Sequence, residues 1–183
     1  MYPNRRTMRL PYYDYTDAGA YFVTVCVAQH RCILGEVQDT DVALSRMGQI
    51  ALAMWEDLPE HFSQVHLDQF VVMPNHVHGI LFIKNESQDN EQSASVRTQR
   101  AASLRRPMRT FGPLQAGELG TIVRSYKSAV TRQVNLLRQT PGHSLWQKKY
   151  YEHVIRDEPD LNRIRQYIVT NPSRWAEDKY YRD

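Results

Sequence analysis

Two histidines spaced two residues apart, His76 and His78, are the side chains best suited to hold a metal ion. They begin an apolar run at residues 76–83 that is typical of a β-strand, where alternate residues point to the same face. Both imidazoles can therefore reach one divalent ion, while Val77 points into the core. The alternative is a pair that only forms hydrogen bonds at the start of the strand. Since no third histidine or cysteine lies near them, an open site for Mg²⁺ or Mn²⁺ is favoured over closed structural zinc.

A tyrosine and an asparagine near the C-terminus could complete such a site. Tyr167 and Asn171 are four residues apart in a segment with helical spacing, so they share one helix face beside the apolar stripe of Leu161, Ile164 and Ile168. Asn171 could supply an oxygen ligand and hold the ion next to the phenol. A phenol is a poor nucleophile at neutral pH unless a metal, base or cation assists it. Spacing alone leaves open a packing role for Tyr167, with Tyr150 and Tyr151 as rival nucleophiles.

The elements that must position these residues follow from hydropathy patterns. Ser45 and Asp157 are suited to begin helices, and Pro172 is suited to end one. The pattern predicts strands at residues 21–27, 65–73, 76–83 and 150–155, and helices at 45–61, 120–138 and 157–171. This order predicts an α+β fold, a ferredoxin-like βαββαβ sandwich. It has an antiparallel sheet with helices on one face, plus a C-terminal helix that carries Tyr167.

One segment departs from this pattern. Residues 85–118 are rich in Ser, Gln, Asn, Arg and Pro and have no apolar period, which predicts a mobile basic insertion in a single domain of residues 1–183. Arg105 and Arg106 belong to a group of arginines that could contact a phosphate backbone. A solvated loop with no partner is the alternative for this segment.

The bulk composition is that of an ordinary globular chain, with 42% apolar and 23% charged residues. A net charge of +3 and a pI near 8.9 permit a nucleic-acid partner without requiring one. No apolar run is long enough to cross a membrane, and the residues after Met1 do not show a signal-peptide pattern. Cys26 and Cys32 do not form a disulfide framework. We therefore expect reduced thiols in a cytoplasmic protein.

Several motifs together resemble the HUH-type single-tyrosine transposases of small insertion sequences, which are named for a His-hydrophobic-His pair. The resemblance is strongest to the REP-associated tyrosine transposases. The matching segments occur in the family's order and cover most of the chain: Asp14-Tyr15 with residues 19–24, then 71–80, 125–128, 145–147, 151–156 and 167–172. The resemblance independently implies the same α+β fold.

The resemblance also assigns roles. It implies that His76 and His78 bind a divalent metal ion and that Tyr167 is a nucleophile, which attacks single-stranded DNA near a hairpin and forms a 5′-phosphotyrosine. Insertion-sequence relatives often have glutamine at the position of Asn171, and asparagine keeps the amide oxygen on a shorter arm. Besides Arg105 and Arg106, we expect Arg124, Lys127 and Arg132 to contact the DNA backbone.

Two other functions remain open from the sequence. One is a catalytically inactive protein that binds hairpin nucleic acid, and the other is a metal-dependent DNA hydrolase in which water attacks and Tyr167 only packs. The family includes dimers, and its REP-associated branch suggests a monomer, so we expect a monomer or a homodimer.

Overall fold

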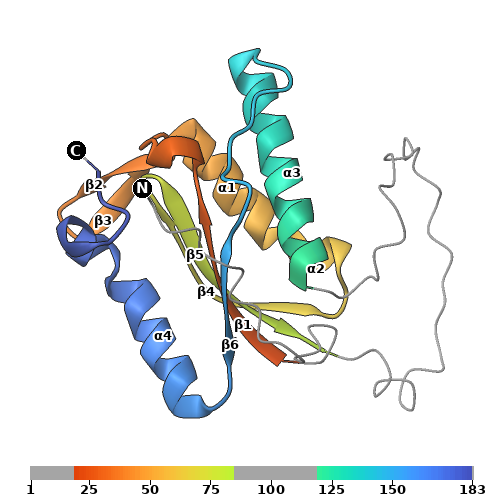
Figure 1. Cartoon of the computed structure of the whole chain (residues 1–183), viewed down its shortest axis with the longest axis vertical. Coiled ribbons are helices and arrows are strands. Elements are labelled where there is room, and N and C mark those ends of the chain that lie inside the picture. Colours follow the sequence, from red (N-terminus) through yellow and green to blue (C-terminus); the bar gives the residue numbers. More distant parts are fainter. Residues whose placement is uncertain (1–18, 85–118, 183) are drawn as a thin grey trace, which may run out of the picture.

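The structure is a computed structural model that describes residues 19–84 and 119–182 (Figure 1). A four-stranded sheet is built from β1, β4, β5 and β6, and a hairpin, β2–β3, lies apart from it. The elements in chain order are β1 (Gly19–Cys26), a 3-10 turn (Ala28–His30), β2 (Gly35–Gln38), β3 (Asp41–Leu44), α1 (Arg46–Glu56), α2 (Leu58–His61), β4 (Val65–Met73), β5 (His76–Ile83), α3 (Leu119–Arg138), β6 (Tyr151–Ile155), α4 (Glu158–Thr170) and a 3-10 helix (Pro172–Glu177).

The sheet confirms the predicted fold. Its strand order is β4-β5-β1-β6, and every neighbouring pair is antiparallel. This is the order that a ferredoxin-like βαββαβ chain produces when each helix connects two strands that do not pair with each other. The two central strands, β1 and β5, are therefore the most buried place in the fold for polar side chains.

The helices lie on both faces of this sheet. Alternate residues of β1 pack into two different apolar clusters: Tyr21 and Val23 contact the side of α1 and α3, whereas Phe22 contacts α4. Figure 1 shows α1 and α3 on one side of the sheet and α4 on the other. Leu161, Ile164 and Ile168 of α4 are buried, as their spacing predicts. The C-terminal helix thus covers the face of the sheet opposite to the other two.

The helix starts agree with the predicted caps. Ser45 Oγ accepts a hydrogen bond from the Gly48 amide at 3.2 Å, and the Asp157 carboxylate accepts one from the Asp160 amide at 2.8 Å. The prediction of one continuous helix over residues 45–61 is wrong, since α1 ends at Glu56 and α2 begins at Leu58. Pro59 lacks an amide hydrogen and occupies the first turn of α2, where none is needed.

Two other features differ from the sequence prediction. The β2–β3 hairpin was missed, because its strands have four residues each and one partly buried face only. Leu137 continues the apolar spacing of Tyr126, Val130 and Val134 along α3, which predicts a buried side chain, yet it is 43% exposed because the helix extends past the edge of the core near its end. Neither difference affects the strands that carry the histidines.

The glycine after the histidine pair is explained by packing. A Cβ atom on Gly79 would lie 2.3 Å from the Trp55 ring and 2.9 Å from the Phe70 ring. Those two rings stack on each other with centroids 4.4 Å apart. Gly79 therefore lets the Trp55 indole lie directly against β5, which holds α1 on the sheet.

We predict that Gly79→Ala lowers the free energy of unfolding by about 1–3 kcal/mol, the usual cost of overpacking a filled core. Urea denaturation of the two proteins measures this. Gly19→Ala is the control, because its Cβ would approach the Tyr21 side chain no closer than 3.3 Å. Equal effects of the two substitutions would show that the Trp55 contact does not require a glycine.

Candidate functional site

The histidine pair lies at the centre of the sheet. His76 and His78 begin β5 and pair with Cys26 and Thr24 of β1, which places both imidazoles on one face. Both residues are fully buried, and their Nε2 atoms are 2.9 Å apart. The predicted common direction of the two side chains is thus confirmed. Val77 points to the opposite face and lies in the main core.

Asn75 fixes the orientation of the His76 ring. Its Nδ2 donates to the carbonyls of His30 at 3.1 Å and Tyr180 at 2.8 Å. Its Oδ1 therefore faces His76 Nδ1 at 2.8 Å, and an amide oxygen can only accept. His76 Nδ1 must carry the proton, which leaves the Nε2 lone pair directed at His78. This is the tautomer that a metal ligand requires.

Thr24 plays the equivalent part for His78. Its Oγ1 lies 2.8 Å from His78 Nδ1. The hydroxyl can accept the Nδ1 proton, so the Nε2 atom of this ring is also available as a ligand. Neither Asn75 nor Thr24 was predicted as a site residue, although both are neighbours of the histidines in sequence or in the strand register.

We predict that Thr24→Val weakens Mn²⁺ binding about 10- to 100-fold, the usual cost of losing a hydrogen-bond partner of a ligand. The substitution keeps the shape of the side chain and removes only the hydroxyl. Titration calorimetry on the metal-free protein measures it, with the thermal midpoint as a check of folding. Unchanged affinity would mean that the Thr24 hydroxyl does not orient His78.

Helix α4 places Tyr167 against the histidines. Its hydroxyl lies 3.3 Å from His78 Nε2, and the two ring centroids are 5.2 Å apart. Arg165 anchors this helix through a two-pronged ion pair with Asp68 of β4, at 2.9 and 2.6 Å. Tyr151, a rival in the sequence analysis, lies on β6 with its ring 6.1 Å from that of Phe22. The Tyr180 ring also lies near His76, with centroids 4.7 Å apart, but it is the hydroxyl of Tyr167 that lies within 3.4 Å of both His78 Nε2 and Asp178 Oδ2.

The C-terminal segment adds a carboxylate that the sequence analysis missed. After α4, the 3-10 helix Pro172–Glu177 turns the chain back toward the histidines. The Asp178 carboxylate then lies with His76 and His78 in a group whose ligand atoms are all within 4.8 Å of one another. Asp178 Oδ2 also accepts a hydrogen bond from the Tyr167 hydroxyl at 3.4 Å. No local pattern predicted this residue, because its position depends on how the segment folds back.

Asn171 also lies at this site. Its Nδ2 donates to Asp178 Oδ2 at 3.1 Å, while its Oδ1 is buried and has no hydrogen-bond partner among the residues that the structure describes. A buried carbonyl oxygen of this kind is normally satisfied by a donor, a water or a cation. Its assignment as a metal ligand remains a prediction.

The donor set fits a divalent cation. Two imidazole nitrogens and one carboxylate oxygen lie within 4.8 Å of one another, and the amide of Asn171, whose Oδ1 has no partner among the described residues, contacts Asp178. Two histidines and one carboxylate leave coordination positions open, as a site for a reacting phosphate needs. The structure brings together the predicted ligands His76 and His78. Asp178, which was not predicted, lies with them.

Burial controls the protonation of these groups. It lowers the pKa of both His76 and His78 below the ordinary value, because the protonated imidazole is destabilised when it is removed from water. Burial, with the nearby Asp178 charge, raises the pKa of Tyr167 to about 12. At neutral pH the imidazoles are therefore free to bind a metal, and the phenol keeps its proton until a cation or a base assists it.

The lowered histidine pKa values give a pH dependence of stability. Between about pH 6.5 and the lower pKa of the folded state, the unfolded chain binds protons that the folded chain does not. The free energy of unfolding of the metal-free protein should therefore fall as pH decreases from 6.5 to 5, by at most about 1.4 kcal/mol per pH unit and histidine. Urea denaturation across this range measures it, and His78→Gln should flatten the slope. An unchanged slope in His78→Gln would contradict this account.

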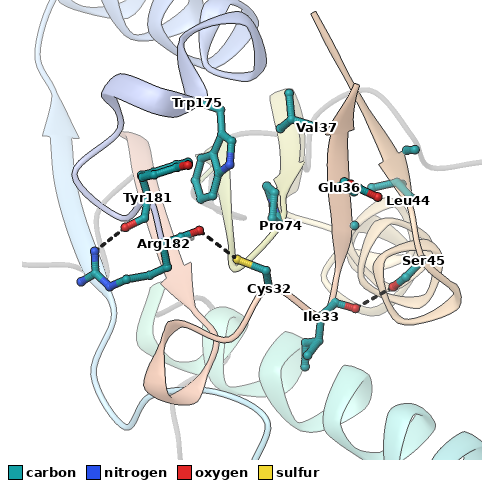
Figure 2. A pocket seen from close by; sticks show the side chains of 12 residues that line it. Cys32, Ile33, Glu36, Val37, Leu44, Ser45, Pro74, Trp175, Tyr181 and Arg182 are labelled. Carbon is teal, nitrogen blue, oxygen red and sulfur yellow. Dashed lines mark hydrogen bonds between the residues drawn. The ribbon is translucent and has the colours of Figure 1, made fainter. Parts of the chain in front are cut away.

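The C-terminal segment also borders a cleft on the side of the molecule that carries the β2–β3 hairpin. Figure 2 shows this cleft, of about 670 Å³, between the tail and the β2–β3 hairpin. Trp175 and Pro74 line it, and the Cys32 thiol approaches the Arg182 carbonyl at 3.9 Å. Trp175 also approaches His76, with ring centroids 6.0 Å apart. The segment is thus packed onto the site from outside. Both cysteines are free, as predicted.

The predicted DNA contacts lie elsewhere. Arg124 and Arg132 are exposed on α3, on the layer opposite to α4. Lys127 is half buried, and its ammonium donates to the carbonyls of Gln147 at 2.8 Å and Lys148 at 3.1 Å. Arg105 and Arg106, with the whole insertion predicted at residues 85–118, are outside the described residues. Their roles in DNA binding stay predictions.

Within the described parts of the chain, none of the helices is both long and apolar enough to span a bilayer.

A solved structure with a similar fold is that of a REP-associated tyrosine transposase bound to a REP hairpin. The TM-score is 0.59 at 18% sequence identity, over 95% of this chain and 77% of that chain. The two proteins share the α+β fold with its antiparallel sheet.

No protein-family model matches the sequence. An uncharacterized protein from Haemophilus influenzae (strain ATCC 51907 / DSM 11121 / KW20 / Rd) is 35% identical over 183 residues, which covers 98% of this chain and 94% of that protein. Identity at this level over nearly the full length of both chains establishes common descent. The chain belongs to the same family as this Haemophilus influenzae protein.

Proposed function

We propose that the protein is a metal-dependent transposase that cleaves and rejoins single-stranded DNA near hairpins, with Tyr167 as the nucleophile. The observation that carries the proposal is the position of the Tyr167 hydroxyl, 3.3 Å from His78 Nε2 and 3.4 Å from Asp178 Oδ2. A phenol that only packs against a core would have no need of two buried imidazoles and a carboxylate at its hydroxyl. The HUH motif at residues 76–78 and the shared fold support the same assignment.

His76, His78 and Asp178 would hold a Mg²⁺ or Mn²⁺ ion, with Asn171 Oδ1 as a further oxygen. Such an ion supplies positive charge that polarises a phosphate and stabilises the oxygens that gain charge during its transfer. Thr24 and Asn75 hold the two rings in the tautomers that bind it. The protein's part is to keep these groups fixed before the DNA arrives.

The reaction then follows from the position of Tyr167. Its hydroxyl proton passes to Asp178, its nearest carboxylate, and its oxygen bonds to the scissile phosphorus. The bond from phosphorus to the 3′ oxygen breaks, and that oxygen takes up a proton from water, while Asp178 returns the tyrosine's proton to solvent. The products are a 5′-phosphotyrosine and a free 3′-hydroxyl. Because one phosphoester bond replaces another, a 3′-hydroxyl can reverse the step or join a new strand without a nucleotide cofactor.

The partner we propose is single-stranded DNA beside a hairpin. The structure with the similar fold is bound to a REP hairpin. In the present chain, Arg124 and Arg132 are exposed cations on α3 that could follow a phosphate backbone. The resemblance of the sequence motifs to REP-associated transposases points to the same class of DNA.

A covalent-adduct assay tests the proposal. The protein is mixed with labelled hairpins from the flanks of its own gene, in Mg²⁺, in Mn²⁺ and in chelator, and run on a denaturing gel. The expected result is a protein–DNA band that requires metal. Cleavage with no adduct would favour hydrolysis by water. Hairpin binding that survives chelation, with neither cleavage nor adduct, would favour a binding protein without activity.

A further inference from the structure

A cavity of about 420 Å³ opens beside Tyr167 and His78 on the face of the sheet covered by α4. It lies on the Tyr167 side of the C-terminal segment, whereas the larger cleft of Figure 2 lies against the β2–β3 hairpin. Its size suits a small planar ligand.

The inner part of this cavity is aromatic. Phe22 lies at its base, with ring centroids 6.1 Å from both Tyr167 and Tyr151 and 5.3 Å from His78. Tyr151 is only half buried, so part of its ring faces the cavity. Phe22 meets both tyrosines edge to face, so the rings do not form one flat surface, and the partly exposed Tyr151 ring is the one on which a base can stack.

The outer part of the cavity carries two cations, Arg163 and Lys179. Two carboxylates also line the cavity, but Glu177 is paired with Arg174 and Asp178 belongs to the group of possible metal ligands. Lys179 Nζ lies 5.3 Å over the Tyr151 ring, and Arg163 lines the opposite part from α4 with its side chain 68% exposed. Asp160 holds Arg163 and also His153, whose Nε2 is 2.7 Å from its carboxylate. The cavity therefore combines an aromatic platform with cations around its opening, which is the combination that binds single-stranded nucleic acid.

We infer that this cavity holds an unpaired nucleobase next to the scissile phosphate, stacked on Tyr151, with a flanking phosphate near Arg163 and Lys179. The inference rests on the proposed function, because the cavity is continuous with Tyr167. Any of the four bases can stack on an aromatic ring. The cavity therefore recognises that a base is present at this position of the strand, not which base it is. A base that is paired within a helix cannot enter the cavity. The cavity therefore favours cleavage in the single strand beside a hairpin over cleavage within the hairpin stem.

The test is an abasic scan of the single-stranded flank of a hairpin that the protein binds. The protein carries Tyr167→Phe, so the DNA stays intact and the aromatic ring is kept. One position should be sensitive, with the Kd raised about 5- to 100-fold when its base is removed. Tyr151→Leu should abolish this sensitivity, and Tyr151→Phe should restore it. 2-Aminopurine at that position should be quenched on binding in the Tyr151→Phe variant and not in Tyr151→Leu.

A charge variant gives a second, independent readout. Arg163→Gln should reduce the slope of log Kd against log salt by about 1, as expected for one lost phosphate contact. Arg156→Gln is the matched control, since Arg156 is exposed on the chain nearby and does not line the cavity. Equal slopes for the two variants would overturn the phosphate contact.

The outcomes separate this inference from the proposed function. Hairpin binding with no base-sensitive position, or with full sensitivity in Tyr151→Leu, would overturn the nucleobase cavity and leave the transposase assignment intact. Absence of binding to any hairpin would overturn both.

Discussion

Tyr167→Phe should lower the rate of DNA cleavage by at least about a thousandfold, as the loss of a covalent nucleophile does in other enzymes. The substitution removes a hydroxyl that lies 3.3 Å from His78 Nε2 and 3.4 Å from Asp178 Oδ2. It keeps the ring that packs on Phe22, so the helix and the cavity should be unchanged. Single-turnover cleavage of a labelled hairpin measures the rate. Hairpin affinity in the same protein should stay within about twofold, because the hydroxyl acts only in the transition state.

Tyr151→Phe is the matched control for this prediction. It removes a hydroxyl from a second tyrosine in contact with Phe22 and keeps the aromatic ring, which is the only part of Tyr151 that the proposed base stacking needs. Its cleavage rate should equal that of the unaltered protein. If Tyr167→Phe cleaves normally and Tyr151→Phe does not, the nucleophile has been assigned to the wrong residue.

His78→Gln should weaken Mn²⁺ binding by more than about a hundredfold, since losing a ligand costs more than losing a ligand's hydrogen-bond partner. His78 is fully buried, and its Nε2 atom lies 2.9 Å from His76 Nε2 and 3.3 Å from the Tyr167 hydroxyl. Calorimetric titration of the metal-free protein gives the affinity. DNA cleavage at a fixed Mn²⁺ concentration should fall with it, while binding of the hairpin itself should persist.

His66→Gln is the control for the metal prediction. His66 is exposed on β4, far from the group of ligands in the register of the sheet, where it pairs with Phe82. Its loss should leave both metal affinity and cleavage unchanged. Cleavage that continues in His78→Gln at low metal concentration would contradict a metal role for the histidine pair.

The fold could be predicted from the sequence because its main elements have strong periodic patterns. Residues 65–73 and 76–83 were placed with the bounds that the structure gives to β4 and β5. The direction of His76 and His78 also followed, because alternation along a strand is fixed by backbone geometry. The environment of Tyr167 was harder to predict. Helical spacing places this residue beside an apolar stripe but does not determine which residues of other elements it contacts.

The remainder of the site depends on contacts between distant residues. Asp178 reaches the histidines because Pro172–Glu177 folds back after α4, and no periodic pattern marks such a turn. Asn75, which orients the His76 ring, is itself held by a hydrogen bond to the carbonyl of Tyr180, a residue 105 positions away. Such contacts are set by the packing of the tail and are invisible to local spacing. The sequence therefore predicted the ligand strand but not the third ligand or the hydrogen bonds that orient the rings.

The most direct measurement of the central claim is the identity of the residue that becomes linked to DNA. The protein is incubated with a hairpin substrate and Mn²⁺, the adduct is digested with nuclease and protease, and the modified peptide is sequenced by mass spectrometry. We expect a nucleotide attached through a 5′-phosphate to Tyr167. A nucleotide on another tyrosine, such as Tyr151, or cleaved DNA with no modified peptide, would contradict it.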